Sequence, residues 1–134
     1  MKTYVFDASA LFAFLQDKPG AAKVRALLNE AMRGRSDIIM SAVNYGEVYG
    51  TLLRGYGTDR ASAVMNAVQP LPINLVPADA QRACAAATVK FRYGLYYVDS
   101  FAAALALEHK ATLVTSDSDF RRLGHGFHVL WLRI

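Results

Sequence analysis

Short apolar segments alternate with longer amphipathic segments along the chain, and this alternation constrains the fold more than any other feature. Strands are predicted at Tyr4–Phe6, Asp37–Met40, Ile73–Val76, Thr112–Thr115 and His128–Leu132. Between these strands, apolar residues recur with the period of an α-helix. Strands that alternate with helices are typical of a parallel sheet flanked by helices, so we predict an α/β fold.

Helices are predicted over Ala10–Leu15, Ala21–Met32, Ser41 to about Arg54, Asp59–Val68, a segment whose first turn holds Pro77, and Asp99–His109. The segment Gly55 to Gly57 is expected to end the helix that begins at Ser41 and to separate it from the helix Asp59–Val68. In the Pro77 helix the residues that follow the helical period are Ala80, Ala83, Cys84, Ala87, Thr88 and Phe91. We therefore expect Cys84 to be a small core residue rather than a nucleophile.

The predicted helix that begins at Ser41 has two distinct faces. One is a wide apolar stripe formed by Tyr45, Val48, Tyr49, Leu52 and Leu53. The other is formed by Val43, Gly46, Glu47 and Gly50, and its glycines suggest that another backbone approaches closely. One interpretation packs the glycine face on the domain and leaves the tyrosine stripe as a subunit interface, while the alternative places both faces in the core.

Composition limits the class of protein. A chain of 134 residues that is 54% hydrophobic can bury a core, and we expect one domain spanning residues 1–134. Its single cysteine, Cys84, excludes an internal disulfide and suits the reducing cytoplasm, where we expect the protein to reside. No signal peptide or membrane span is predicted. The net charge of +4 comes from scattered basic residues and is compatible with a phosphate-rich partner.

Four acidic residues stand in apolar or small-residue contexts. Asp7 ends the first strand, Asp117 follows the fourth strand by two residues, Asp99 begins a helix and Glu47 lies within another. If the first and fourth strands are neighbours, Asp7 and Asp117 face one crevice at the carboxyl ends of the strands, where open α/β sheets place their sites. Each acid also has a plainer interpretation, because Asp7 and Asp99 can cap helices and Asp117 can belong to an ordinary turn.

A cluster made only of carboxylates indicates a particular chemistry. Oxygen ligands bind hard divalent cations such as Mg²⁺ or Mn²⁺ rather than zinc. Mg²⁺ usually keeps several waters, which leaves positions for a phosphate oxygen and an attacking water. That arrangement suits metal-assisted hydrolysis of a phosphodiester bond.

The acids and their contexts resemble the PIN-domain family, and within it the VapC-type toxins of toxin–antitoxin pairs. The segments that carry the resemblance are Val5–Leu11, Ser41–Val48, Tyr97–Ala106 and Leu113–Phe120. The resemblance covers essentially the whole chain, in length, order and spacing. It implies a parallel five-stranded sheet of order 3-2-1-4-5 and an endoribonuclease that depends on Mg²⁺ or Mn²⁺.

The resemblance also implies site residues. By position, the catalytic quartet is Asp7, Glu47, Asp99 and Asp117, and the metal ligands are Asp7, Asp99 and Asp117. Asp119 resembles an accessory acid, and Thr115 and Ser9 resemble hydroxyls that support the carboxylates. Val98 stands where such toxins often have glycine, and Ser100 stands where alanine is common, but neither departure removes a ligand.

The implied partners are an RNA substrate, a second copy of the chain in a homodimer, and a small VapB-type antitoxin in a larger assembly. An acidic pocket would receive an arginine of the antitoxin. Two alternatives remain open. One is a metal- or RNA-binding module without activity. The other is a phosphoaspartyl phosphatase or a receiver domain. Such a phosphatase would have a second acid where this chain has Ser9. A receiver domain would have a lysine after a late strand, whereas Lys110 precedes the fourth predicted strand.

Overall fold

The computed structural model describes residues 1–133 and contains one five-stranded sheet. Its strands are β1 (Lys2–Phe6), β2 (Ser36–Ser41), β3 (Asn74–Val76), β4 (Thr112–Thr115) and β5 (His128–Trp131). All four pairings are parallel, and the spatial order is β3-β2-β1-β4-β5. The predicted fold class and strand order are therefore confirmed, and β1 and β4 are neighbours.

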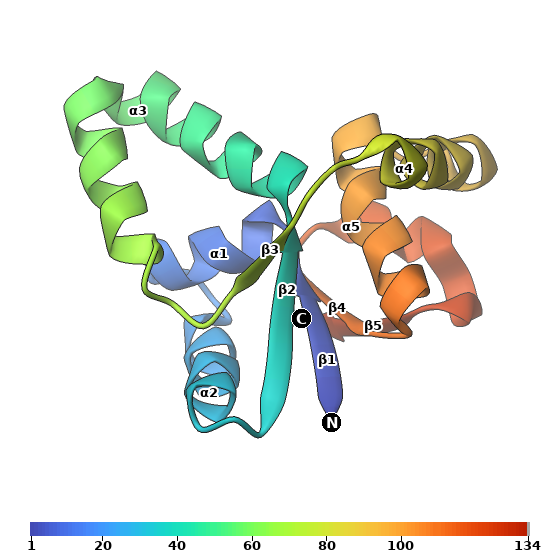
Figure 1. The fold of residues 1–134 in the computed structure, drawn as a ribbon, viewed down its shortest axis with the longest axis horizontal. Helices are drawn as coiled ribbons and strands as arrows, with labels where there is room; N and C mark the ends of the chain where they lie inside the picture. The colour runs from blue at the N-terminus through green and yellow to red at the C-terminus, as the bar shows by residue number, and fades with distance from the viewer. Residues whose placement is uncertain (134) are drawn as a thin grey trace.

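Helices cover both faces of this sheet (Figure 1). Helices α1 (Ala8–Leu15), α2 (Ala21–Met32) and α3 (Ala42–Val68) lie on one side of it. Helices α4 (Ala80–Tyr93) and α5 (Tyr97–His109) lie on the other side, and a 3₁₀ segment, η1 (Ser118–Gly126), links β4 to β5. All strands run in one direction, so their carboxyl ends meet at one edge of the sheet.

The alternation of side chains along the central strands creates two cores. In β1, Phe6 packs in the cluster on the α1–α3 side, while Val5 packs in the cluster on the α5 side. In β4, Val114 and Leu113 divide between the same two clusters. Because side chains on both faces of the central strands pack in a core, apolar residues follow one another without alternation at Tyr4–Phe6 and at Leu113 and Val114, which explains why these strands could be identified as short apolar runs.

Helix α3 corrects one sequence interpretation. Val48 and Leu52 are fully buried, and Tyr45, Tyr49 and Leu53 pack against the same core cluster. The apolar stripe is therefore core and not a subunit interface, whereas Gly46 and Glu47 are exposed. No backbone approaches the glycines either: a Cβ at Gly46 would meet nothing within 4 Å, and one at Gly50 would meet only the flexible end of Arg54.

The predicted break in α3 lies where glycine permits it. Gly57 has φ 79° and ψ 175°, which interrupts the helix, and the two halves run at an angle to each other (Figure 1). Residues other than glycine rarely adopt this backbone conformation. The helix thereby bends around the α1 side of the domain.

Helix α4 corrects two further expectations. It begins at Ala80 with Asp79 as its N-cap, so Pro77 lies before the helix instead of in its first turn. Its buried residues are Ala86 and Val89, whereas Cys84 is exposed and Phe91 keeps 89% of its surface exposed. The stripe that contains Cys84 is thus the outer face of the helix.

None of the helices within residues 1–133 has the length and apolar character that crossing a membrane would require.

Candidate active site

The candidate site begins at the carboxyl ends of β1 and β4. Phe6 pairs with Val114 in the sheet, Asp7 directly follows the last residue of β1, and Thr115 is the last residue of β4. Asp7 has an extended backbone and its side chain accepts a hydrogen bond from the Ala10 amide, so it caps α1. Capping and membership of an acidic site are therefore not alternatives for Asp7, because the structure combines them.

Two hydroxyl groups hold the buried Asp7 carboxylate. Ser9 Oγ donates to Oδ1 at 2.7 Å, and Thr115 Oγ1 donates to Oδ2 at 2.5 Å. The Ala10 amide donates to Oδ1 at 2.9 Å. Asp7 is only 5% exposed, so these three donors replace the hydrogen bonds that water would make to an exposed carboxylate.

The same hydroxyls also shape the loop after β4. Thr115 Oγ1 accepts a hydrogen bond from the Asp117 amide, and Ser9 Oγ accepts one from the Ser116 amide, both at 2.9 Å. Asp117 in turn caps η1, because its Oδ1 accepts from the Asp119 amide at 2.9 Å. One hydrogen-bonded unit therefore links the position of Asp7 to that of the Asp117–Asp119 turn.

Asp99 enters the site from the first turn of α5. The helix starts at Tyr97, two residues earlier than predicted, and its N-cap is Tyr96. Asp99 is thus not the cap of its helix. A carboxylate in a first helical turn is favoured by the helix dipole, which partly offsets repulsion by other acids.

Glu47 enters from α3, which begins after β2 with Ser41 as its N-cap. The Ser41 hydroxyl accepts a hydrogen bond from the Val43 amide at 3.2 Å. Glu47 lies in the second turn of this helix and is exposed, so of the predicted quartet it is the residue most open to solvent.

Electrostatics show that these acids share one field. Burial and repulsion raise the pKa of Asp99 to about 7, and the repelling groups in order of effect are Asp117, Glu47, Asp7 and Asp119. All four other acids of the predicted site therefore act on Asp99. Each additional negative charge disfavours the ionised form, which is the pattern expected where a cation is to be bound.

The pKa values of two other acids are also shifted. Burial raises the pKa of Asp7 to about 6, although its bonds to Thr115, Ser9 and Ala10 oppose the shift. Desolvation is the main cause that raises the pKa of Glu47, followed by repulsion from Asp117, while the Asn44 amide and Arg54 oppose it. Groups with raised pKa values concentrate at this edge of the sheet, as they do at many functional sites.

Three carboxylates are arranged so that one cation can contact all of them. Asp99, Asp117 and Asp119 each offer an oxygen, and these oxygens lie within 4.8 Å of one another. All three residues are half-buried. The donor set consists only of oxygen and fits Mg²⁺ or Mn²⁺. This group includes Asp119, predicted as an accessory acid, and does not include Asp7, which was predicted as a ligand.

Sequence reasoning missed one polar residue beside these acids. Asn44 is 1% exposed and its Nδ2 donates to the Val98 carbonyl oxygen at 3.0 Å. Its contact lies 54 residues away in the chain, so no local pattern reveals it. The available signal was a single amide in the helix predicted from Ser41 to about Arg54, three residues before Glu47.

A sequence model of the PIN domain matches residues 4–126. Among solved structures, the DNA-bound VapBC from Salmonella typhimurium has a TM-score of 0.76 at 17% identity, with 98% of this chain and 99% of that chain covered. VapBC2 from Rickettsia felis, bound to a promoter DNA fragment, has a TM-score of 0.73 at 13% identity, with 96% and 97% covered.

The sarcin-ricin loop cleaving toxin VapC20 from Mycobacterium tuberculosis is similar as well, with a TM-score of 0.64, 19% identity, and 90% and 95% covered. No curated protein sequence matches the chain. At these identities the likeness to solved structures establishes the fold.

Proposed function

The chain belongs to the PIN-domain family, and from that premise we propose that it is a VapC-type endoribonuclease that depends on Mg²⁺ or Mn²⁺. The observation that carries the proposal is the grouping of Asp99, Asp117 and Asp119 oxygens within 4.8 Å, next to Asp7 and Glu47. The whole chain of 134 residues is taken as one nuclease domain.

The acids divide into three roles in this proposal. Asp99, Asp117 and Asp119 hold the cation, which when bound offsets charge on the scissile phosphate and makes water a better nucleophile. Asp7 organises the site through Ser9 and Thr115, and a free lone pair on its Oδ2 remains for the cation.

Glu47 is assigned the proton-accepting role. It belongs to the quartet but lies outside the close oxygen group, and it is exposed to solvent, so a substrate can reach it. Desolvation and the repulsion of Asp117 raise its pKa, which improves a carboxylate as a base. The open surface beside it, formed by Gly46 and Gly50, leaves room for a nucleic-acid backbone.

An assay with total RNA tests this function. The purified chain is incubated with RNA in Mg²⁺, in Mn²⁺ and in excess EDTA, and with a single-stranded DNA of matched length. The proposal expects cleavage of RNA with either metal and none in EDTA. RNA binding without cleavage in any metal would instead support the module without activity.

We also propose that the chain forms a homodimer through the outer face of α4. This face is defined by Ala80, Ala83, Cys84, Ala87, Thr88 and Phe91 and carries no charged side chain. In a two-fold symmetric dimer this face of one copy contacts the same face of the other. Charged residues on such a face would repel their own copies, whereas uncharged residues do not. Phe91, at 89% exposed, would lose most of its contact with water in this dimer.

The third partner in this proposal is a small antitoxin. Three of the similar solved structures are described as VapBC complexes, from Rickettsia felis, Salmonella typhimurium and Haemophilus influenzae. The carboxylate group of this chain would bind an arginine of such a partner in place of the metal. Co-expression with a neighbouring small reading frame should then restore growth of cells that produce the chain.

A further inference from the structure

Asn44 links the two helices that carry Glu47 and Asp99. It lies three residues before Glu47, which places both side chains on adjacent turns of one face of α3. Its Nδ2 donates at 3.0 Å to the carbonyl oxygen of Val98, the residue before Asp99 in the first turn of α5. A single side chain thus joins α3 near one acid to the backbone beside another.

This contact is not explained by the needs of the fold. Val98 is the second residue of α5, so its carbonyl oxygen lies where helices already supply an intrahelical donor. The bond from Asn44 is therefore an additional one, for which a carbonyl oxygen has a second lone pair. What it adds is a fixed separation between the start of α5 and the first turns of α3.

The other half of the amide strengthens this view. Nδ2 donates to the Val98 carbonyl oxygen. If the amide were flipped, Oδ1 would face that carbonyl oxygen and two acceptors would repel each other, so the orientation of the amide is fixed. Oδ1 then has no donor among residues 1–133, although Asn44 is 1% exposed. Burying an unpaired acceptor is unfavourable. A leucine has the same branched shape without polar atoms and would avoid this cost, so stability alone gives no reason for an amide here.

We propose that Asn44 is a positioning residue that fixes Asp99, a member of the carboxylate group that fits a divalent cation, relative to Glu47 on α3. In the absence of a cation, these like charges repel and favour the separation of α3 from α5. The bond to Val98 opposes that movement from a position one helical turn away from Glu47. The inference rests on the proposed function only in that the acidic group binds a metal.

Two substitutions separate positioning from packing. Asn44→Leu keeps the branched shape, with somewhat larger methyl groups, and removes both the Val98 bond and the unpaired Oδ1, so its melting temperature in EDTA should stay close to that of the wild type. Asn44→Ala leaves a cavity and should melt lower. Mn²⁺ binding to each metal-free, RNA-free chain is measured by titration calorimetry. Both variants should bind Mn²⁺ about 10–100-fold more weakly, the usual effect of losing a group that orients a ligand.

Ser36→Ala is the matched control. Oγ of Ser36 is the other buried side-chain atom without a partner among residues 1–133, and it lies at the opposite end of the sheet, where β2 begins. This variant should bind Mn²⁺ as the wild type does. If the wild type cleaves RNA, the Asn44 variants should lose kcat while KM for RNA stays within about twofold.

The outcomes are separable. Wild-type affinity for Mn²⁺ in both Asn44 variants would overturn the inference, and so would a wild-type chain that binds no Mn²⁺ at millimolar concentration. A wild-type chain that binds Mn²⁺ but cleaves no RNA would overturn the proposed function. In that case weaker Mn²⁺ binding by Asn44→Leu would still support the positioning role.

Discussion

Thr115 Oγ1 donates a hydrogen bond of 2.5 Å to Oδ2 of Asp7, which joins residues 108 positions apart in the chain. The same oxygen accepts from the Asp117 amide at 2.9 Å. One hydroxyl therefore stabilises the charge of Asp7 and fixes the loop that carries Asp117. The bond is possible because β1 and β4 are adjacent and parallel, so that Asp7, directly after β1, lies beside Thr115, the last residue of β4.

Thr115→Val should weaken the site more than the fold. Valine has nearly the same shape, but it leaves the Asp117 amide without its acceptor and removes one donor to Asp7. The free energy of unfolding should fall by about 1–3 kcal/mol. Mg²⁺ should bind about tenfold more weakly or worse. Thr112→Val, in the same strand but at its other end, is the control and should leave Mg²⁺ binding unchanged.

Asp7→Asn should produce a metal-free chain at least as stable as the wild type at pH 8. Burial raises the pKa of Asp7 from 3.8 to about 6, so its ionised form opposes folding by on the order of 3 kcal/mol. The amide has no charge and still caps α1, but it fits the Ser9 and Thr115 donors less well. We expect a net gain of about 1–2 kcal/mol, or roughly 3–8 °C in melting temperature.

The same variant should lose cleavage and gain less stability from Mg²⁺, because a ligand stabilises only in proportion to its affinity for the folded chain. Asp79→Asn is the matched control, since Asp79 caps α4 as Asp7 caps α1. Melting curves with and without Mg²⁺ measure both effects. An Asp7→Asn chain with an undiminished Mg²⁺ shift would remove Asp7 from the site.

The stability of the metal-free chain should fall as pH rises from 5 to 8. The Asp99 carboxyl has a pKa of about 7 in the folded chain and 3.8 when unperturbed, so the folded state binds more protons between these values. Its stabilising contribution is therefore present at low pH and is lost as pH rises toward 7. Asp7, with a pKa of about 6, changes stability in the same direction.

Saturating Mg²⁺ should oppose that trend, because the cation binds carboxylates in their ionised form. The increase in melting temperature caused by Mg²⁺ should thus be larger at pH 8 than at pH 5. Asp99→Asn serves as the reference that cancels the titration of groups elsewhere. A metal-free slope identical in wild type and Asp99→Asn would contradict this assignment of the pKa.

Phe91→Asp should convert the proposed dimer to a monomer. The change places a charge on the otherwise uncharged outer face of α4, where a two-fold axis would bring it close to its own copy. Light scattering at micromolar concentration measures the result. Met32→Asp, at an exposed apolar residue of α2, is the control and should leave the mass unchanged. A wild-type chain that is strictly monomeric would refute the dimer.

The central sheet was predictable from the sequence for a physical reason. Strands with both faces in a core lack the alternation of apolar and polar residues, so Tyr4–Phe6 and Leu113–Val114 stand out as apolar runs bounded by polar residues. Glycine marks the bend at Gly57 because it tolerates a positive φ. Local chemistry determines these features, and local chemistry is what a sequence pattern records.

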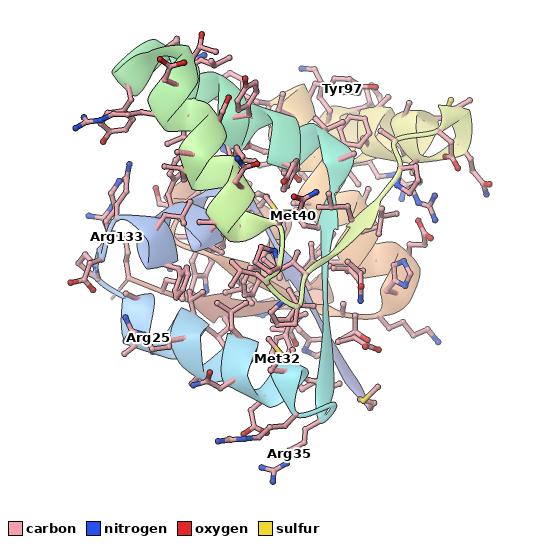
Figure 2. The ribbon with its side chains drawn as sticks, turned by 60° about the vertical axis from the view of Figure 1, so that its left-hand side comes forward. Arg25, Met32, Arg35, Met40, Tyr97 and Arg133 are labelled. Atoms are coloured by element: carbon pink, nitrogen blue, oxygen red, sulfur yellow. The ribbon has the colours of Figure 1, made fainter. Side chains whose placement is uncertain are left out.

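The faces of α4 were not predictable in the same way. Alanines occur on every side of this helix, so the helical period defines stripes but does not say which one is buried. Contact with α5 selects Ala86 and Val89 and leaves Cys84 outside. Figure 2 shows Tyr97, the first residue of α5, next to α4. The start of α3 lies near the same place.

The acids of the site were identified by their place after strands and within helices, but the sequence did not indicate which of them form the close oxygen group. Membership of Asp119 in the close oxygen group depends on the turn that Asp117 caps. The role of Asn44 depends on a contact across 54 residues. Both follow from tertiary packing, which brings together segments that no local pattern connects.

The most direct test compares wild type with Asp99→Asn, since Asp99 is the acid on which all the others act. Both chains are incubated with the same single-stranded RNA, in Mg²⁺ and in excess EDTA, after melting curves establish that both are folded. We predict cleavage only by the wild type and only with Mg²⁺. Undiminished cleavage by the wild type in EDTA, or equal cleavage by Asp99→Asn in Mg²⁺, would contradict a metal-dependent ribonuclease centred on these carboxylates.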